Sequence, residues 1–565
     1  MEQRAIIAAI LSLLVLFLYQ AYVAKQQKPQ TAPPPPSAEG PPPAKEKPVQ
    51  EKKEGAPVKA RETRVQEAKI EKFVPEQAPA AMVEEEIPVD TPLVNAIFST
   101  HGARLRSVKL KAFHQTLSPD SDLVDLVTAA DPKSLPLEVS FLNSGTIVPP
   151  DAFYIPDKKG VVLRGGEKQA LVFTSGKRIR IQKIFSFEAD TYAIGLKVSM
   201  ENRTRAPLQG TMLLRWIGAA GAQKSSYDYV GPVALVGGKL VNYTAKEGGT
   251  QEFSSDVRWA GFEDKYFIAA MIPKIPLQGV KFDSVSASLV HPLVVVPPRG
   301  VLSYSYELYL GPKELGRLKA LQVDLDKAID YGWFHSIAKP LLLVLKAFYS
   351  FSGNYGVAII LLTLVVRVVF FPLNQMSYRS MKEMQKLQPK IAELREKYKD
   401  DKERLNRETM DMYRQHKVNP FGGCLPILIQ IPVFIALYQA LMKSIELRHA
   451  PFVWWIQDLS SPEVLFSLCV SPSFCIPARL LPLLMGVTTF IQQKMTPTTG
   501  DPQQAKMMLW FMPIMLTVFF WGLPSGLVLY WTVNNVLSIA QQVYINRKAD
   551  VEKSYGYPKQ SQRNP

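Results

Sequence analysis

The sequence contains few of the side chains from which most catalytic and metal sites are built. It has 3 cysteines and 6 histidines among 565 residues, and so few cysteines exclude a scaffold built from disulfides. No group of cysteines and histidines has the spacing of zinc ligands, and no nucleotide-binding motif of the Walker type is present. We therefore expect a protein that is not an enzyme and that holds no metal or other cofactor.

Charge and hydropathy are unevenly distributed along the chain. The 66 basic and 50 acidic residues give a net charge of +16, which is typical of a nucleic-acid-binding protein or of a membrane protein with basic cytoplasmic loops. The hydrophobic share of 47% is ordinary, but roughly the last 200 residues carry long apolar runs. These runs favour a polytopic α-helical membrane protein in contact with lipids, without sequence-specific binding of nucleic acid.

The N-terminal region begins with an apolar segment and continues with a proline-rich one. Ala5–Ala24 is uncharged and long enough to cross a bilayer of about 30 Å. Tyr22 stands where a small residue is expected before a cleavage site, which favours a signal anchor over residues 1–24 rather than a cleaved signal peptide. Residues 25–88 are rich in Pro, Lys and Glu, and this composition predicts an extended tether, with a ligand for proline-binding domains as the alternative.

Residues 89–312 show hydrophobic alternation with a period of two, the pattern of half-buried strands. The clearest runs are Tyr192, Ile194, Leu196, Val198 and Met200, and Leu302, Tyr304, Tyr306, Leu308 and Leu310. This pattern predicts a large antiparallel β-sandwich. Its histidines, His101, His114 and His291, are far apart in the sequence, so we expect a binding or scaffolding domain without a catalytic site.

Residues 313–350 contain two amphipathic segments. Leu315, Leu318, Leu321 and Leu325 are spaced by three or four residues, which predicts a helix over Lys313–Asp330. Trp333–Phe348 is apolar with scattered Lys and His residues, a mixture typical of a helix that lies in the membrane interface.

Residues 351–545 contain five further apolar segments of about the length of a membrane span. We place the spans at about 355–373, 421–442, 479–495, 507–523 and 524–545. The segment 374–420 has 12 basic against 8 acidic residues, and the tail 546–565 adds five basic ones, so both are expected in the cytoplasm. With the anchor there are six spans, which put both termini in the cytoplasm and the sandwich on the other side of the membrane.

The charged segment 374–420 also carries an apolar stripe. Met381, Met384, Leu387, Ile391, Leu394 and Tyr398 are spaced by three or four residues, and Leu405, Met412 and Tyr413 follow an Asp-Asp pair. The stripe predicts an antiparallel helical hairpin that projects into the cytoplasm, with a solvated loop as the alternative.

Two cysteines, Cys469 and Cys475, fall in the predicted outer loop 443–478. The bacterial periplasm is oxidising, which permits a disulfide between them. Plain apolar packing is the alternative for these two cysteines and for Cys424.

Arg367 is the most specific candidate for a functional residue, because it stands inside the apolar run LLTLVVRVVFFPL. An arginine at the centre of a span costs roughly 2.5–3.5 kcal/mol on insertion scales, so such residues usually face a partner or a water-filled cavity. The alternative is that the side chain extends to the head groups near Pro372. The other predicted spans offer uncharged polar groups: Gln430, Thr488, Thr489, Asn534, Asn535 and Ser538. An unpaired cation among such groups favours a hydrated concavity that attracts an anion.

Three motifs resemble the YidC family of membrane protein insertases. They are NPFGGCLPILIQIPVFIALY (Asn419–Tyr438), KMTPTTGDPQQAKMM (Lys494–Met508) and FWGLPSGLVLYWTVNN (Phe520–Asn535). The resemblance implies five core spans around a hydrophilic groove and an outer domain similar to a sugar-binding fold without sugar chemistry. The family's groove positions fall on Arg367, Thr363 and Gln430, and its substrate contacts fall on Tyr530 and Trp531. Trp531 stands where other members carry tyrosine, which keeps the aromatic ring but not the hydroxyl.

The family resemblance implies that nascent membrane proteins enter the groove from the cytoplasm and leave sideways into the lipid. It also implies contacts of the outer domain with the Sec translocon. The basic, apolar-striped hairpin is expected to recruit the ribosome or the signal-recognition receptor. A small-molecule or lipid transporter is the alternative function, but the apolar segments show no repeated halves.

Overall fold

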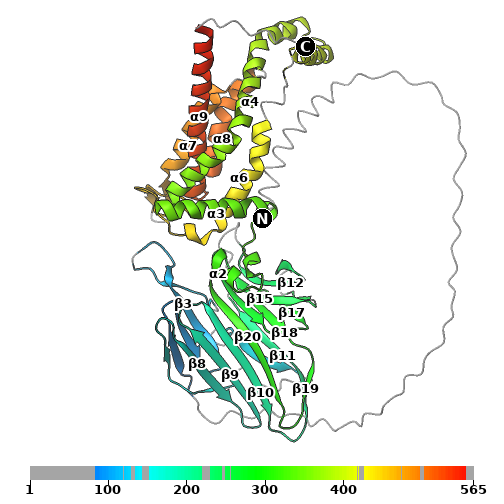
Figure 1. The fold of residues 1–565 in the computed structure, drawn as a ribbon, viewed down its shortest axis with the longest axis vertical. Coiled ribbons are helices and arrows are strands. Elements are labelled where there is room, and N and C mark those ends of the chain that lie inside the picture. Colours follow the sequence, from blue (N-terminus) through cyan, green and yellow to red (C-terminus); the bar gives the residue numbers. More distant parts are fainter. Residues whose placement is uncertain are drawn as a thin grey trace, which may run out of the picture.

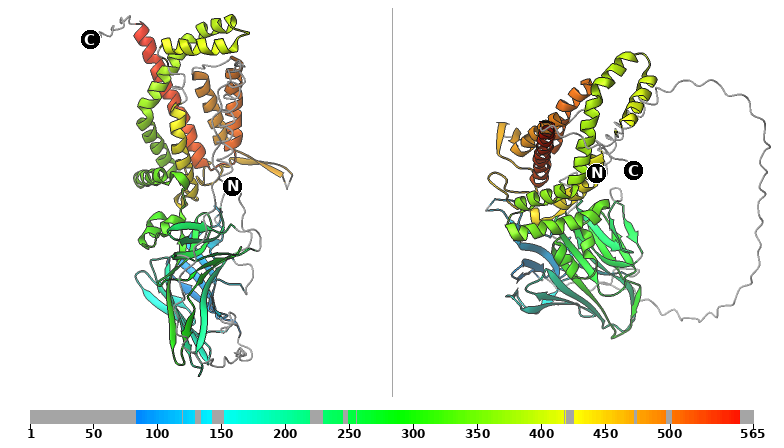
Figure 2. Two further views of the ribbon diagram at one scale, coloured as in Figure 1. Left: turned by 90° about the vertical axis from the view of Figure 1, so that its right-hand side faces the viewer. Right: turned by 45° about the horizontal axis from the view of Figure 1, so that its top comes forward.

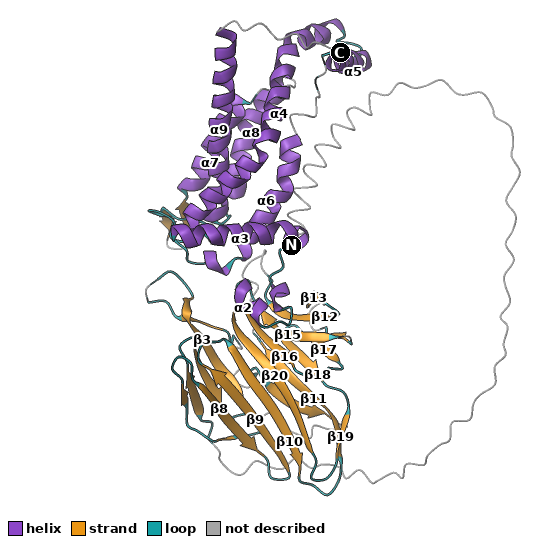
Figure 3. Ribbon diagram, in the orientation of Figure 1, coloured by secondary structure: helices purple, strands orange, loops and turns teal. Residues whose placement is uncertain are grey.

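The computed structural model describes residues 83–554, except 119, 129–133, 143–151, 219–228, 245–248, 255, 417, 419–424, 472–473 and 497–501. The anchor expected over 1–24 and most of the expected tether lie outside the described residues. The described chain has a β-rich domain followed by a helical part (Figures 1 and 3). A β-rich domain joined to a helical region is what the sequence predicts at this level.

Three sheets build the β-rich domain. The largest, in the order β13-β12-β15-β16-β20-β10-β9-β8-β6, contains β6 (Ile155–Pro156), β8 (Lys168–Ser175), β9 (Ile179–Glu188), β10 (Ala193–Asn202), β12 (Gly231–Val236), β13 (Lys239–Asn242), β15 (Val257–Glu263), β16 (Phe267–Pro273) and β20 (Val301–Pro312). The second, in the order β14-β17-β18-β11-β19 with β5 beside β11, contains β5 (Glu138–Leu142), β11 (Leu208–Ile217), β14 (Gln251–Phe253), β17 (Gly279–Phe282), β18 (Ser286–Val290) and β19 (Val294–Val296). The third, in the order β4-β3-β2-β1-β7, contains β1 (Glu86–Asp90), β2 (Val94–Ser99), β3 (Arg104–His114), β4 (Leu123–Asp125) and β7 (Val161–Val162).

The alternation seen in the sequence is present at the centre of the largest sheet, where β10 pairs with both β9 and β20. Along β9, from Ile179 onward, every second side chain is buried. The buried side chains form an aromatic-rich core in which the rings of Phe98 and Phe185 are 4.6 Å apart between centroids. Among the described strands the pairing is antiparallel everywhere except between β1 and β7.

The β-rich domain begins before its expected boundary at residue 89. β1 starts at Glu86, pairs along its whole length with β2, and buries Ile87 to 1% exposure. Proline is usually confined to edge strands or strand starts. Pro88 and the proline-rich sequence before it therefore do not predict a strand here.

The continuous helix predicted over Lys313–Asp330 is wrong. The structure has a short helix α2 (Leu315–Ala320) and a 3₁₀ turn η1 (Leu325–Ala328). Between them, Gln322 and Asp324 have φ values of 56° and 58°, which a right-handed helix cannot accommodate. The break lets leucines on both sides of it enter the buried core.

A helix lies where the interfacial helix is expected. The 3₁₀ turn η2 (Gly332–Phe334) leads into α3 (His335–Ser352), which lies across the end of the helical bundle that faces the β-rich domain (Figure 1). Trp333 is 94% exposed, and α3 leaves Leu343 and Phe351 exposed as well. Exposed apolar and aromatic side chains are what an interfacial helix needs.

Five helices occupy the positions of the five spans expected in the core. They are α4 (Tyr355–Lys397), α6 (Leu425–Lys443), α7 (Leu480–Met495), α8 (Pro502–Phe520) and α9 (Ser525–Ser554). α4 continues without a break through the expected boundary at residue 373, although it contains Pro372 and Pro389. α9 continues into the tail expected from residue 546.

The number of membrane spans stays a prediction. Among the described residues, α4 is the one helix that is long and apolar enough to cross a membrane by length and hydropathy. Shorter apolar stretches cover Ile429–Lys443 in α6 and Lys506–Phe520 in α8.

The charged segment 374–420 forms two packed helices. α5 (Lys402–Gln415) folds back on the C-terminal half of α4. Met384, Leu387 and Ile391 of α4 share a small core with Tyr413 of α5, separate from the main core. This α4–α5 hairpin lies at the end of the molecule opposite the β-rich domain (Figure 2).

Candidate functional site

Arg367 lies in the apolar half of α4 and reaches across to α9. Its Nη2 donates to the backbone carbonyl of Asn534 at 3.0 Å and to the hydroxyl of Ser538. Its Nε is buried and has no hydrogen-bond partner among the described residues. No carboxylate in the described part of the chain forms an ion pair with this guanidinium, so uncharged groups alone compensate its positive charge.

α9 presents a polar stripe to its neighbours because its polar residues recur at helical spacing. Asn534 and Ser538 are four residues apart and lie on one face, toward α4. Asn535 lies one position round the helix and donates through Nδ2 to the hydroxyl of Thr489 on α7 at 2.8 Å. All these side chains are buried, so α9 is held to both α4 and α7 by polar groups within an apolar bundle.

Two more of the residues singled out in the sequence join this site. Gln430 of α6 places Nε2 3.4 Å from Oδ1 of Asn534. Tyr530 of α9 is buried, and its hydroxyl lies near Gln430 and Arg367 without a hydrogen bond of normal geometry among the described residues. Side chains of α4, α6 and α9 therefore converge on one polar site.

Thr363 and Trp531 do not present polar groups to this site. Thr363 is completely buried, and its hydroxyl donates to the carbonyl of Ile359 in its own helix at 2.6 Å. Trp531 packs edge-on against Phe434, with ring centroids 4.9 Å apart, and against Phe520 at 5.1 Å. Both residues support the packing around the site rather than its polar surface.

The face of α4 that carries Arg367 also carries residues that the sequence analysis did not single out. Asn374 and Tyr378 follow Arg367 by seven and eleven residues, which places them on the same side of a helix. Asn374 is buried, and Tyr378 lies near Arg367. Their spacing from the arginine was the signal available in the sequence.

Cys469 and Cys475 face each other across a two-stranded ribbon of β21 (Phe466–Ser471) and β22 (Phe474–Ala478). The structure joins them in a disulfide. Cys424 lies outside the described residues.

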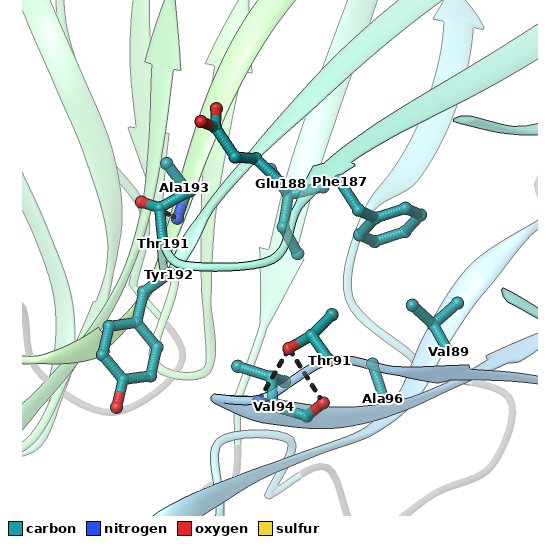
Figure 4. A pocket seen from close by; sticks show the side chains of 10 residues that line it. Val89, Thr91, Val94, Ala96, Phe187, Glu188, Thr191, Tyr192 and Ala193 are labelled. Atoms are coloured by element: carbon teal, nitrogen blue, oxygen red, sulfur yellow. Dashed lines mark hydrogen bonds between the residues drawn. The ribbon is translucent and has the colours of Figure 1, made fainter. Parts of the chain in front are cut away.

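Two features of the described part of the β-rich domain bear on whether it could hold a metal ion or another ligand. Across the described residues, no three His, Cys, Asp or Glu side chains are grouped so as to hold a metal ion. A hollow between β1, β2 and the turn after β9 has a volume of about 10 Å³, enough for one water at most (Figure 4). Thr91 at its edge uses its hydroxyl to bond the backbone of Val94 (Figure 4).

A larger cavity of about 420 Å³ lies where the β-rich domain meets the helical bundle. Arg448 borders it and joins the two parts, because its Nη2 donates to the backbone carbonyls of His114 and Gln115 in the β3–β4 region. The same guanidinium lies over the rings of Tyr266 and Phe267. Arg448 therefore joins the two parts through Nη2 and through the face of its planar guanidinium.

Comparisons with known proteins give a consistent result. Residues 86–344 match the family model of the YidC periplasmic domain, and residues 347–553 match that of the 60Kd inner membrane protein. The membrane protein insertase YidC of Syntrophus aciditrophicus is 43% identical over 97% of this chain and 100% of its own, and that of Pelobacter propionicus is 41% identical over 97% and 99%.

Solved structures are more distantly similar. An active YidC insertase with its first transmembrane domain resolved is 19% identical, with a TM-score of 0.36 over 82% of this chain and 93% of that one. A galactose mutarotase related enzyme from Lactobacillus acidophilus has a TM-score of 0.28 over 40% of this chain and 97% of that one. TM-scores this low do not establish a relationship. Sequence identity above 40% along almost the whole length does establish one. The chain belongs to the YidC family of membrane protein insertases.

Proposed function

We propose that this chain is a membrane protein insertase that moves transmembrane segments of nascent proteins from the cytoplasm into the bacterial inner membrane. The observation that carries the proposal is the placement of Arg367, a cation in an apolar helix whose Nε lacks a partner among the described residues. The full-length relatives that bear the insertase name support the same function.

The surface of the helical part supports a position within lipid. Its exposed side chains are large and apolar on several helices: Leu364, Val365, Val368 and Val369 on α4, Leu483, Leu484, Val487 and Ile491 on α7, and Met507, Phe511, Ile514 and Val518 on α8. A water-soluble protein rarely exposes so much contiguous apolar surface. We infer that α4, α6, α7, α8 and α9 are spans and that the anchor adds a sixth.

The helix lengths favour a short path across the membrane. α7 has 16 residues, which corresponds to about 24 Å at 1.5 Å per residue. A hydrocarbon core is typically about 30 Å thick, so a helix this short favours local thinning of the bilayer around it. A thinner apolar layer lowers the cost of carrying a polar tail across it.

Arg367 supplies the electrostatic part of the mechanism. A polar or acidic tail that leaves water loses hydration, and the guanidinium offsets part of that loss when the tail approaches the polar site of α4, α6 and α9. The apolar segment behind the tail then leaves sideways into lipid, driven by burial of its apolar surface. No bond is made or broken in this sequence of steps.

Orientation and partners follow from charge. The α4–α5 hairpin and the basic C-terminal tail are assigned to the cytoplasm, where the hairpin would meet the ribosome or the signal-recognition receptor. The β-rich domain at the opposite end of the bundle is assigned to the periplasm, where it would contact the Sec translocon (Figure 2).

The test compares Arg367→Lys with Arg367→Ala in proteoliposomes, with paired substrates whose translocated tails are acidic or neutral. We expect the lysine variant to stay largely active, because a positive charge suffices for the proposed role. The alanine variant should lose insertion of the acidic tail by about tenfold or more, since a hydrogen bond to a charged group is worth about 1.5–3 kcal/mol. Protease protection of the tail is the measurement.

Ser538→Ala is the matched control, because it removes one of the hydrogen bonds of Arg367 and keeps the charge. If the only role of Arg367 were to hold α4 against α9, Ser538→Ala would reproduce the defect of Arg367→Ala. We expect a smaller loss that is equal for acidic and neutral tails. Equal insertion by Arg367→Ala and the unaltered protein would refute the proposed role.

A further inference from the structure

The ribbon of β21 and β22 exposes apolar side chains outside the helices. The sequence from Val464 to Ala478 contains no charged residue. Phe466 and Leu468 are 53% and 60% exposed, and Val464 and Leu465 just before them are also exposed. We propose that this ribbon lies on the outer leaflet of the bilayer, with its apolar side chains among the lipid head groups and upper acyl chains.

The charges that flank the ribbon are turned into the bundle. Glu463, the last charged residue before it, is buried and accepts a hydrogen bond from the backbone N–H of Leu481 at 2.5 Å. Arg479, the first charged residue after it, donates to the carbonyl of Trp521. The ribbon therefore leaves the bundle between two anchored charges and presents an uncharged surface of its own.

The position of the ribbon matches the membrane surface. It projects sideways from the bundle at the level of α3, and the left view of Figure 2 shows the two elements on opposite sides of the bundle. Only Arg479, whose side chain bonds the bundle, separates the ribbon in sequence from α7, where Leu483 and Leu484 are exposed. This proximity favours lipid as the occupant over a separate protein partner.

The unpaired backbone groups of the ribbon limit how deeply it can enter the bilayer. A two-stranded ribbon leaves the outer N–H and C=O groups of both strands unpaired, and these groups cannot enter the hydrocarbon core. The ribbon must therefore lie flat in the interface, where water still reaches its edges. The bond between Cys469 and Cys475 joins directly opposed residues and fixes the register of a hairpin that would be only marginally stable alone.

The experiment replaces Phe466 with p-benzoyl-phenylalanine in the full chain and reconstitutes the protein in vesicles of equal parts phosphatidylethanolamine and phosphatidylglycerol. After irradiation, mass spectrometry measures the fraction of the peptide that carries a lipid. The same residue replaces Val518 on α8, 70% exposed, as the lipid-facing reference, and Val301 at the start of β20, 64% exposed, as the aqueous reference. Mass spectrometry of the cystine-linked peptide verifies that the ribbon is intact in each variant.

We expect position 466 to yield about tenfold more lipid adduct than position 301 and an amount comparable to position 518. Adduct at 466 no higher than at 301, with strong adduct at 518, would show that the ribbon stands in water and would overturn the proposal. In native membranes, crosslinks from 466 to a protein in place of lipid would overturn it equally. Weak adduct at both 466 and 518 would overturn the lipid placement of the whole bundle and this proposal with it.

Discussion

Lys183 lies in the core of the β-rich domain, with an exposure of 1%. Its Nζ donates to three backbone carbonyls, those of Gly102 at 2.7 Å, Ala103 at 3.2 Å and Leu137 at 2.8 Å. Ala103 and Leu137 have φ values of 45° and 67°, a strained region for residues with a side chain. Burial, followed by the nearby Arg104, holds the pKa of the Lys183 ammonium well below its usual range.

Lys183→Met should destabilise the β-rich domain by about 3 kcal/mol or more. The substitution fits the space but leaves three buried carbonyls without their donor, and each such loss costs about 1–3 kcal/mol. Urea unfolding followed by hydrogen exchange of β9 measures the change. Lys197→Met, on the exposed side of β10, is the matched control and should change stability by less than about 0.5 kcal/mol.

We expect His291 to make the β-rich domain sensitive to acid. It is buried, its ring is stacked 3.9 Å from that of Tyr304, and its Nε2 is hydrogen-bonded to the hydroxyl of Tyr306. Burial lowers the pKa of His291 to about 4. Between about pH 6.5 and pH 4 the unfolded chain binds a proton that the folded chain does not, so stability is lost as the pH falls through that window.

We expect hydrogen exchange of the amides of β18 and β20 to accelerate as the pH is lowered from 7 to 4.5, after correction for the intrinsic rate. His291→Gln cannot titrate and should remove most of this acceleration, although it lowers stability at pH 7. The same acceleration in the variant as in the unaltered protein would assign the acid sensitivity to other groups.

At the scale of elements, the α4–α5 hairpin has a core of its own and can be altered without touching the polar site. Deleting Lys386–Leu405 should reduce co-translational insertion about tenfold or more, because the local concentration of ribosomes at the membrane falls. Insertion of pre-synthesised substrates into proteoliposomes should be nearly unchanged. A normal co-translational rate would show that recruitment does not use this hairpin.

A point substitution gives a finer test of the same hairpin. Ile391→Ala removes a buried side chain between α4 and α5 and should cost about 2–5 kcal/mol of local stability. Gln385→Ala on the exposed face of α4 is its control. Hydrogen exchange of α5 should rise in the first variant and not in the second.

The sequence predicts those elements whose pattern of apolar residues lies within the element itself. It does not predict features that depend on packing against distant parts of the chain. The alternation of β9 and β10 and the stripe of Met384, Leu387 and Ile391 are local periodicities, and the strands and the helix appear where they predict. The break at Gln322 and Asp324 is not local, because it is the β-rich domain that buries leucines on both sides of it. The periodicity of the leucines therefore predicts a longer helix than the one that tertiary packing allows.

The same distinction separates the parts of the candidate site. Arg367 is conspicuous in sequence because a charge in an apolar run is costly wherever the run folds. Its partners Asn534 and Ser538 depend on how α4 crosses α9, which no spacing within one helix reveals. Thr363 shares a helix face with Arg367. Its hydroxyl nevertheless donates to a carbonyl of its own helix and not to the polar site, and the helical spacing does not reveal this choice of partner.

At the scale of the whole molecule, the β-rich domain is joined to the bundle through a limited junction. Arg448 bonds two backbone carbonyls of the domain, Lys443 donates to the carbonyl of Asp330, and a cavity of about 420 Å³ remains between the two parts. Buried apolar side chains of both parts nevertheless belong to one continuous cluster.

A variant that lacks residues 83–329 should still support growth when the unaltered protein is depleted. The polar site lies on α4, α6 and α9, none of which the deletion removes. Arg448→Ala in the full chain, which loosens only the junction, should behave in the same way. Loss of growth with either variant present in the membrane at normal levels would contradict this expectation.

α4 is one unbroken rod of 43 residues, and this has a mechanical consequence. Arg367 and the hairpin residue Leu387 are 20 positions apart on it, about 30 Å along the axis at 1.5 Å per residue. In a straight helix a tilt of one end moves the other, so a tilt of the hairpin would move the guanidinium. Pro372, whose nitrogen cannot bond the preceding turn, is a point of low bending stiffness between the two ends. Bending at Pro372 would absorb part of a tilt of the hairpin before it reaches the guanidinium.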